Sequence, residues 1–290
     1  MYRAFADSNE DIMFGLENTY NQAVKVSQNV VEDIRFGRKL YLDPVDLCSS
    51  QICEYKNEVE NILIFLIKVK DKNPYMYSHP VNVAFLSLII GNWLGLDDSK
   101  LLNLVRTGLL HDIGKAKIKD SLLNKAEALT SKEVEKLKSH PVISYKMLNS
   151  LNKYDIEVLK GVLFHHERMD GTGYPLGIRG NSINLYSKII AIADTFDALT
   201  SDKTYRNKYS HLKALEEIKE NSSNLDKNIC NIFLDKMTEF YCSREVRLNN
   251  ERTGSIVALN PEKLSKPLVR CDVDYYDLTL VDDLEIVEFL

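Results

Sequence analysis

The sequence predicts a mostly α-helical protein with a small β-rich end. Apolar residues recur at helical spacing through most of the first 240 positions, and capping signals precede several of these stretches. After Ser243, short β-branched segments alternate with turn residues. A chain of 290 residues, 44% of them hydrophobic, can bury a full core. We expect three parts: an N-terminal helical segment (1–70), a central helical domain (71–242) and a C-terminal β appendage (243–290).

The N-terminal segment is expected to form two helices. Ser8 and Asp11 resemble a capping box that opens the first helix. Asp43 and Pro44 offer an N-cap and a first-turn proline for the second helix, which would run through Leu66. No chemical motif occurs here, so the segment is interpreted as a helical cap or as the contact of a homodimer, with a sensory role as the alternative.

The central domain shows one helical stretch after another. Pro80 indicates a kink or a helix start, Thr130 and Glu133 form a capping box, and His140-Pro141 should stop or bend a helix. The helix before Thr200 is almost wholly apolar except at Asp194 and Asp197. Helices are expected at 78–94, 101–110, 130–140, 155–164, 185–200, from 212 onward, and at 229–240.

The C-terminal appendage is expected to be a small sheet. Its segments are short and partly alternating, and Asn249-Asn250, Thr253-Gly254 and Pro261 separate them with turn chemistry. Strands are expected at 244–248, 255–259, 268–274 and 278–281.

Composition and charge exclude several classes of partner. The net charge is −5, from 37 basic and 42 acidic residues, so no polybasic field exists to bind a nucleic-acid polymer. The longest apolar runs, at 62–67 and 83–90, are too short to span a bilayer, and no secretory pattern occurs. We expect a cytoplasmic protein without membrane insertion. The five cysteines form no CxxC pair, which favours reduced, packed thiols.

Seven side chains in the central domain predict a metal centre. Five of the six histidines of the chain lie between positions 79 and 166, and two aspartates occupy otherwise apolar helices, where an unpaired charge is costly. Imidazole and carboxylate ligands without thiolate suit iron, manganese, zinc or nickel. Seven ligands exceed the needs of one metal, so two metals that share a carboxylate are expected to activate a bridging hydroxide for phosphodiester hydrolysis. The candidate ligands are His79, His111, Asp112, His140, His165, His166 and Asp194.

Over residues 71–240 these motifs resemble the HD-GYP phosphodiesterases of the HD superfamily. His79, His111-Asp112 and Asp194 resemble the ligands shared by the superfamily. His140-Pro141, the run at 165–167 and Gly173-Tyr174-Pro175 resemble the HD-GYP subgroup. The resemblance implies an HD-type helical bundle that hydrolyses cyclic di-GMP, mainly to linear pGpG. The expected cofactor is two divalent metal ions, iron or manganese, with other transition metals as the alternative.

The resemblance also implies a role for each residue. Asp112 would bridge the metals; His79, His111 and Asp194 would complete one site, and His140, His165 and His166 the other. Lys115 would contact the scissile phosphate or protonate the leaving oxygen. The implied substrate-binding residues are Tyr174, Gly171, Gly173, Lys203 and Arg206; family members often have arginine at the position of Lys203. Tyr75 stands where members with a third metal carry glutamate.

Two further classes of function compete with this enzyme. One is a non-catalytic receptor that keeps the fold and binds a cyclic dinucleotide. The other is an HD phosphohydrolase that acts on another nucleotide, such as cyclic GMP-AMP or a mononucleotide. The intact set of seven ligands argues against the receptor, and Gly173-Tyr174-Pro175 argues against a mononucleotide hydrolase.

Overall fold

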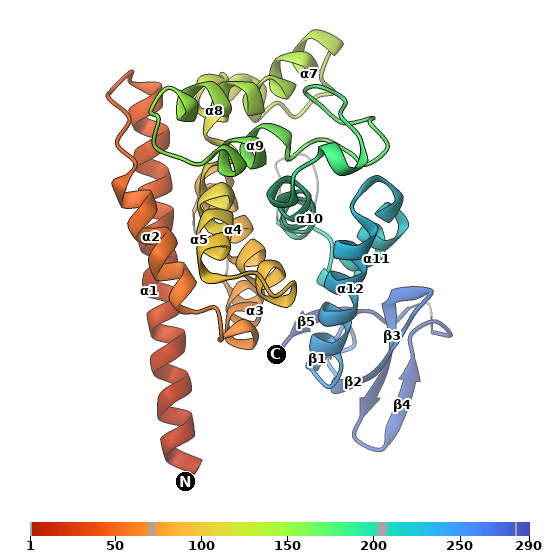
Figure 1. Ribbon diagram of the computed structural model, residues 1–290. Coiled ribbons are helices and arrows are strands. Elements are labelled where there is room, and N and C mark those ends of the chain that lie inside the picture. The colour runs from red at the N-terminus through yellow and green to blue at the C-terminus, as the bar shows by residue number, and fades with distance from the viewer. Residues whose placement is uncertain (1, 70–72, 202–207, 282) are drawn as a thin grey trace.

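The computed structural model describes residues 2–69, 73–201, 208–281 and 283–290. It shows a helical body and a small sheet at the C-terminal end, as the sequence predicts (Figure 1). Within the described residues, no helix has the length and apolar character needed to cross a bilayer.

The N-terminal segment contains three helices where two were predicted: α1 (Tyr2–Arg35), α2 (Asp43–Glu54) and α3 (Val59–Lys68). The predicted capping box at Ser8 is wrong, because no glycine or proline breaks the chain before it and α1 begins at Tyr2. The predicted second helix is interrupted after Glu54, where Glu58 N donates a 2.8 Å hydrogen bond to Tyr55 O in a tight turn.

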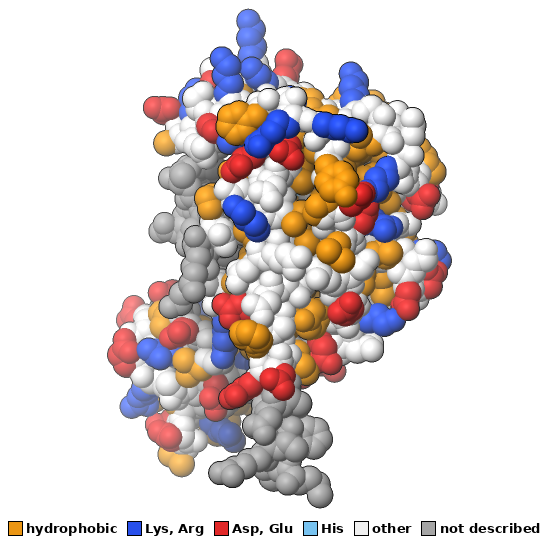
Figure 2. Space-filling model, turned by 90° about the vertical axis from the view of Figure 1, so that its left-hand side faces the viewer, with side chains coloured by type: hydrophobic (Ala, Val, Ile, Leu, Met, Phe, Trp, Pro, Cys, Tyr) orange, Lys and Arg blue, Asp and Glu red, His pale blue; other side chains and the backbone are white. Residues whose placement is uncertain are grey.

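Helix α1 packs along the body rather than standing apart from it. Its apolar stripe belongs to the same continuous core as the central helices and is formed by Leu16, Tyr20, Ala23, Val24, Val30, Val31 and Ile34. Phe14, by contrast, is 69% exposed. The face over α1 and α2 carries acidic and basic side chains interspersed with separate hydrophobic ones, without a field of one charge (Figure 2). Dimerisation through these helices stays a prediction.

The central domain is built around α4 (Tyr75–Trp93), which is buried along most of its length between α5 (Asp98–Leu110) and α10 (Leu185–Thr200). Pro80 lies inside α4, which runs on from Tyr75 without a break. Proline lacks the N–H that would bond to the carbonyl of Met76, and this loss in the first turns is tolerated. The fourth residue before His79 therefore lies one turn away on the same helix.

The remaining central elements follow the predicted order. They are η1 (Ile113–Lys117), α6 (Asp120–Leu123), α7 (Ser131–Lys138), α8 (His140–Asn149), α9 (Ile156–Phe164), η2 (Gly180–Ser182), α11 (His211–Glu220), η3 (Ser222–Asn224) and α12 (Lys227–Tyr241). The capping box of Thr130 and Glu133 is present at the start of α7. The predicted stop at His140-Pro141 is where α8 begins, with the proline in its first turn. Helices α7, α8 and α9 gather at the end of the body away from the sheet (Figure 1).

The sheet has the strand order β4-β3-β2-β1-β5, with every pair antiparallel. Its strands are β1 (Glu245–Leu248), β2 (Thr253–Asn260), β3 (Lys263–Cys271), β4 (Asp274–Asp277) and β5 (Ile286–Phe289). The predicted strand at 278–281 is wrong. Asp277 accepts hydrogen bonds from Thr279 N at 2.9 Å and Thr279 Oγ1 at 2.6 Å, which closes a turn instead. The strand predicted at 268–274 is two strands that meet at Asp272, whose φ is 53°.

The sheet and the helical body meet at an aromatic cluster around His211. The ring of His211 lies 6.0 Å from Phe196, 6.2 Å from Tyr241 and 5.9 Å from Phe289, measured between centroids. Burial among these rings, together with the charge of Lys208, lowers the pKa of His211 to about 4. His211 is therefore a neutral packing residue at neutral pH. It is the one histidine that was not predicted to be a ligand.

Candidate metal centre

All seven predicted ligands come together at one end of the bundle. Their ligand atoms form two groups, and within each group the atoms lie within 4.8 Å of one another. The first group contains His79, His111 and Asp194, and the second contains Asp112, His140, His165 and His166. Five helices or helix ends supply them. His79 comes from α4 and Asp194 from α10, His140 opens α8, and the two adjacent pairs follow α5 and α9.

The backbone fixes which nitrogen each imidazole presents. Nδ1 of His111, His140 and His165 each lies 2.7 Å from a carbonyl oxygen three residues earlier. Since a carbonyl can only accept, Nδ1 must carry the proton, and the neutral ring offers the Nε2 lone pair to the centre. This pattern of a ligating nitrogen backed by a hydrogen-bonded one is typical of metal-binding histidines.

Several buried atoms in the centre have no hydrogen-bond partner. They include Nε2 of His79, Nε2 of His111 and Oδ1 of Asp112. Buried polar atoms without partners are costly, because they lose their contact with water and gain nothing in return. Metal ions would satisfy all three, so the residues present fit the divalent metals that the sequence predicts.

Asp112 lies between the two groups with one oxygen turned to each. Its Oδ1 is 3.0 Å from His140 Nε2, while its Oδ2 is 3.4 Å from His111 Nε2 and 3.5 Å from His79 Nε2. Burial opposes ionisation of this carboxyl, yet the charge of Lys115 beside it holds its pKa well below the ordinary value. An ionised carboxylate with this orientation is suited to bridging two cations.

The histidines differ in charge. Burial lowers the pKa of His165 and of His166 well below the ordinary value, so both rings are neutral and ready to ligate. Burial has the same effect on His79, but its contacts with the carboxylates of Asp112, Asp194 and Asp197 outweigh it and raise its pKa well above the ordinary value. A metal ion at His79 would take the place of a proton.

A buried hydrogen-bond chain runs from His79 to the N-terminal helix. His79 Nδ1 lies 2.6 Å from Asp197 Oδ2, and Asp197 Oδ1 accepts a 2.7 Å bond from Asn82 Nδ2. Asn82 Oδ1 in turn accepts a 2.8 Å bond from the hydroxyl of Tyr20 on α1. The sequence predicts no role for these residues. For Asp197 a signal existed, since it stands three residues after Asp194 on an apolar helix; for Asn82 and Tyr20 there was none.

The main chain sets how closely the two ligand groups approach. Gly114, two residues after Asp112, donates a 2.8 Å hydrogen bond from its N–H to Ser144 Oγ, and that hydroxyl donates to His111 O at 3.0 Å. A Cβ on Gly114 would lie 2.2 Å from His140 O. Helix α8 and the segment that carries Asp112 are therefore in contact at the backbone, which only glycine permits.

The loop after α9 folds back on the second ligand group. Buried Glu167 accepts hydrogen bonds from Leu176 N at 2.7 Å and Gly177 N at 3.1 Å. The ring of Tyr174 stacks on His166 with centroids 4.6 Å apart. A Cβ on Gly173 would lie 2.4 Å from His166 O, so its close approach is to the loop's own backbone. Substrate contacts at Gly171 and Gly173 stay a prediction.

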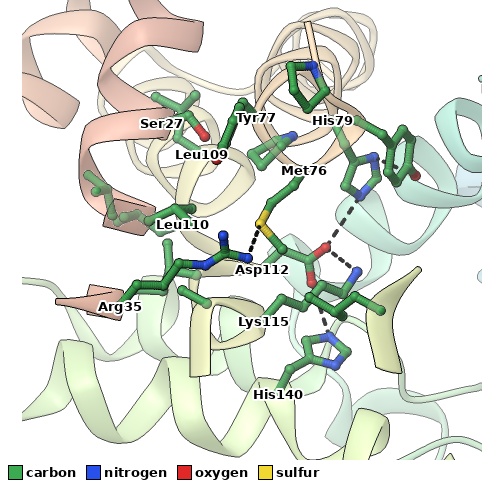
Figure 3. A pocket seen from close by; sticks show the side chains of 18 of the residues that line it. Ser27, Arg35, Met76, Tyr77, His79, Leu109, Leu110, Asp112, Lys115 and His140 are labelled. Carbon is green, nitrogen blue, oxygen red and sulfur yellow. Dashed lines mark hydrogen bonds and ion pairs between the residues drawn. The ribbon is translucent and has the colours of Figure 1, made fainter. Parts of the chain in front are cut away.

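A cavity of about 710 Å³ opens onto the centre. His79, Asp112, Lys115, His140 and Tyr174 line it, and it continues along α1 (Figure 3). Lys115 forms an ion pair with Asp112 Oδ2. The two basic residues predicted to bind the substrate, Lys203 and Arg206, lie outside the described residues.

The fold and the centre define an all-helical domain that gathers histidine and aspartate ligands into two groups suited to metal ions. The family model of the HD domain matches residues 66–229, and the chain belongs to this family. The motifs at 165–167 and 173–175 place it in the HD-GYP group of that family, as the sequence predicted.

Three relatives illustrate the match. A cyclic di-GMP phosphodiesterase of Pseudomonas aeruginosa is 31% identical over 83% of this chain and 58% of its own length. The cyclic di-GMP phosphodiesterase PdeB of Borreliella burgdorferi is 32% identical over 67% of this chain and 52% of its own length. A 3′3′-cGAMP-specific phosphodiesterase of Vibrio cholerae is 35% identical over 56% of this chain and 35% of its own length. The chain thus spans little more than half the length of the first two.

Among solved structures, an HDG"Y"P protein from Bdellovibrio bacteriovorus has the same fold. It superimposes with a TM-score of 0.62 at 18% identity, over 81% of this chain and 79% of its own. This likeness covers more of the chain than the family model does, and it supports the predicted HD-type helical bundle.

Proposed function

We propose that this protein is a metal-dependent phosphodiesterase that hydrolyses cyclic di-GMP, mainly to linear pGpG. The observation that carries the proposal is the position of Asp112, whose two oxygens face the two ligand groups at 3.0 Å and 3.4 Å. The adjoining cavity of about 710 Å³ has the size of a small-molecule site. The activities in the names of the relatives from Pseudomonas and Borreliella support the same substrate.

The proposed cofactor is a pair of divalent metal ions, iron or manganese. One would be held by His79, His111 and Asp194, and the other by His140, His165 and His166, with Asp112 between them. When bound, such a pair activates a water nucleophile and neutralises charge on the phosphate.

The protein's own groups would do the rest. Lys115 holds a proton on Nζ beside Asp112 Oδ2 and would deliver it to the leaving oxygen or bind the phosphate. Tyr174, fixed by its stacking on His166, would form the wall against which a base rests. Lys203 and Arg206 are proposed to bind the substrate, and Gly171 and Gly173 to shape the loop that faces it.

The proposed number of metals rests on Tyr75. It lies one turn before His79 on α4, and its hydroxyl is 3.0 Å from His79 Nδ1. A phenol, whose free pKa is about 10, is protonated at neutral pH and a weak ligand, whereas a carboxylate here would add the negative charge that a third cation needs. Two metals per chain and slow release of GMP are therefore proposed.

A second candidate substrate is cyclic GMP-AMP. The relative from Vibrio cholerae is named as specific for 3′3′-cGAMP, and it is 35% identical over the matched residues. Its substrate shares the phosphodiester ring of cyclic di-GMP, so the same metal centre would serve both.

The test combines metal analysis with a product assay. Protein purified without oxygen would be analysed for metals and incubated with cyclic di-GMP, 3′3′-cGAMP and cyclic di-AMP. We expect two metals per chain, with pGpG from cyclic di-GMP as the main product. Tight binding without turnover by the metal-loaded protein would support a receptor, and hydrolysis of mononucleotides alone would overturn the proposal.

A further inference from the structure

The cavity at the metal centre extends well beyond it. Its far wall is formed by α1, which lies outside the residues 66–229 matched by the family model. Val26, Val30 and Val31 contribute an apolar surface there, and Arg35 stands at its edge. Of the described residues that line the cavity, two carry a permanent positive charge, Lys115 and Arg35. Each is paired with a carboxylate, Lys115 with Asp112 at the centre and Arg35 with Asp120, and Arg35 is the one that comes from α1.

Two contacts hold the side chain of Arg35, and a third bond fixes the helix end that carries it. Its guanidinium donates a 3.3 Å hydrogen bond to Met76 Sδ and forms an ion pair with Asp120. Lys117 Nζ donates a 2.8 Å hydrogen bond to Ile34 O, which fixes the end of α1 against η1. Figure 3 shows Arg35 reaching from α1 toward Met76, with the side chains of Asp112 and Lys115 beyond the sulfur. The side chain is 27% exposed, so a ligand can reach it.

A cyclic dinucleotide brings two phosphates into this cavity, and the metal centre takes only one of them. The other phosphate loses water on binding and needs a cation, because an unpaired buried charge is costly. A guanidinium suits this task, since it offers a planar fork of five N–H donors, more than its contacts with Met76 and Asp120 use. The apolar wall of α1 fits the face of a nucleobase.

We propose that Arg35 binds the phosphate that is not cleaved, so that the N-terminal helix is part of the substrate site. The inference rests on the proposed function, because it takes a cyclic dinucleotide as the ligand. It adds a residue from outside the matched HD domain, and it explains why the cavity continues past the metal centre.

The main test compares Arg35→Ala with Arg38→Ala, three residues on, where the guanidinium pairs with Asp33 instead. We expect Arg35→Ala to raise KM and Kd for cyclic di-GMP by about tenfold or more, the usual effect of losing a charged hydrogen bond, and to change kcat little. Hydrolysis of bis(p-nitrophenyl) phosphate, which has one phosphate, should stay unchanged. Arg38→Ala should alter the kinetics with neither cyclic di-GMP nor bis(p-nitrophenyl) phosphate. An unchanged KM for cyclic di-GMP, or equal losses on both substrates, would overturn the inference.

Asp120→Asn separates ligand binding from a structural role. This variant removes the ion pair of Arg35 but keeps the guanidinium, so KM for cyclic di-GMP should stay the same or fall. If Arg35 only anchors α1, both variants would raise KM and lower the melting temperature alike. Competition by cyclic di-AMP shows whether Arg35 contacts a phosphate or a base. Arg35→Ala should weaken the binding of cyclic di-AMP as much as the binding of cyclic di-GMP. A loss limited to guanine ligands would mean a contact with the base. A wild-type protein that binds no cyclic dinucleotide would instead refute the proposed function.

Discussion

The hydroxyl of Tyr20 donates a hydrogen bond of 2.8 Å to the side-chain oxygen of Asn82, and both residues are buried. Through Asp197 this contact continues to His79, a predicted ligand of the first group. A residue 62 positions away from Asn82 in sequence is thus part of the support of the metal centre. Partners of metal-bound histidines orient the ring, so α1 is connected to the chemistry by this chain as well as by the cavity wall.

Tyr20→Phe should weaken metal binding without unfolding the protein. The phenyl ring keeps the packing, but Asn82 Oδ1 loses its donor, at a cost of about 1–3 kcal/mol in stability. Asp197 is the direct partner of His79, so Asp197→Asn should lower metal affinity, measured by chelator competition, by about 10–100-fold. Tyr20→Phe should lower it by less. If Tyr20→Phe lowers stability but leaves metal affinity normal, the hydrogen bonds from Tyr20 do not influence His79.

Asp112→Asn should abolish hydrolysis and lower metal content, because an amide cannot bridge two cations as a carboxylate does. The loss in kcat should be about a thousandfold or more, comparable with other central electrostatic groups. Turnover, bound metal and the circular dichroism spectrum would be measured together. Asp98→Asn, at an exposed position on α5, is the control and should behave as wild type. Normal turnover in Asp112→Asn would refute the site assignment.

Tyr75→Glu should raise the number of bound metals from two toward three. A carboxylate one turn before His79 shares its helix face and supplies negative charge beside the pair. Anomalous scattering would count the ions, and chromatography would follow GMP. Tyr75→Phe serves as the control and should keep two metals and pGpG as the main product. Three well-occupied ions in the wild-type protein would contradict this account of Tyr75.

The protein should lose stability as pH falls from about 6.5 toward 4, in part through His211. Burial lowers the pKa of this ring to about 4 in the folded state, against about 6.5 in the unfolded chain, so the unfolded chain binds more protons between these values. Stability is therefore complete above about pH 6.5. At pH 5 the loss from this residue should be about 1–2 kcal/mol.

His211→Phe isolates that contribution. A phenyl ring can pack with Phe196, Tyr241 and Phe289 but cannot bind a proton. Urea midpoints of both proteins at pH 7.5 and pH 5.0, with chelator present to remove metal effects, should show a smaller pH dependence in the variant. Equal pH dependence in the two proteins would assign the acid sensitivity to other groups.

Local signals account for the parts of the fold that the sequence predicted well. The helices α7 and α9 have recognisable starts at Thr130 and Asp155, and both were predicted near their true bounds. The start of α1 was missed because nothing in its first residues either caps or breaks a helix. Strand β5 was missed because it is short and exists through pairing with β1, where Arg247 faces Glu288. Such long-range pairing leaves no local pattern.

The candidate site also has a part that the sequence predicts and a part that depends on tertiary contacts. Its seven predicted ligands are residue types that are rare in apolar helices, so sequence alone could single them out. Arg35 and Asn82 are ordinary residues of their helices and gain their positions only when α1 packs on the central domain. Ser144, likewise, joins the HD segment through a contact 30 residues away. Side chains that support a site through tertiary contacts carry no motif.

The contact between Gly114 and the carbonyl of His140 makes the spacing of the centre a property of the main chain. Side chains adjust by rotating, but two touching backbones do not. The main chain therefore fixes the distance between the two ligand groups. A change of one methyl group at Gly114 would widen it and impair both halves at once, although the glycine itself contributes no ligand atom.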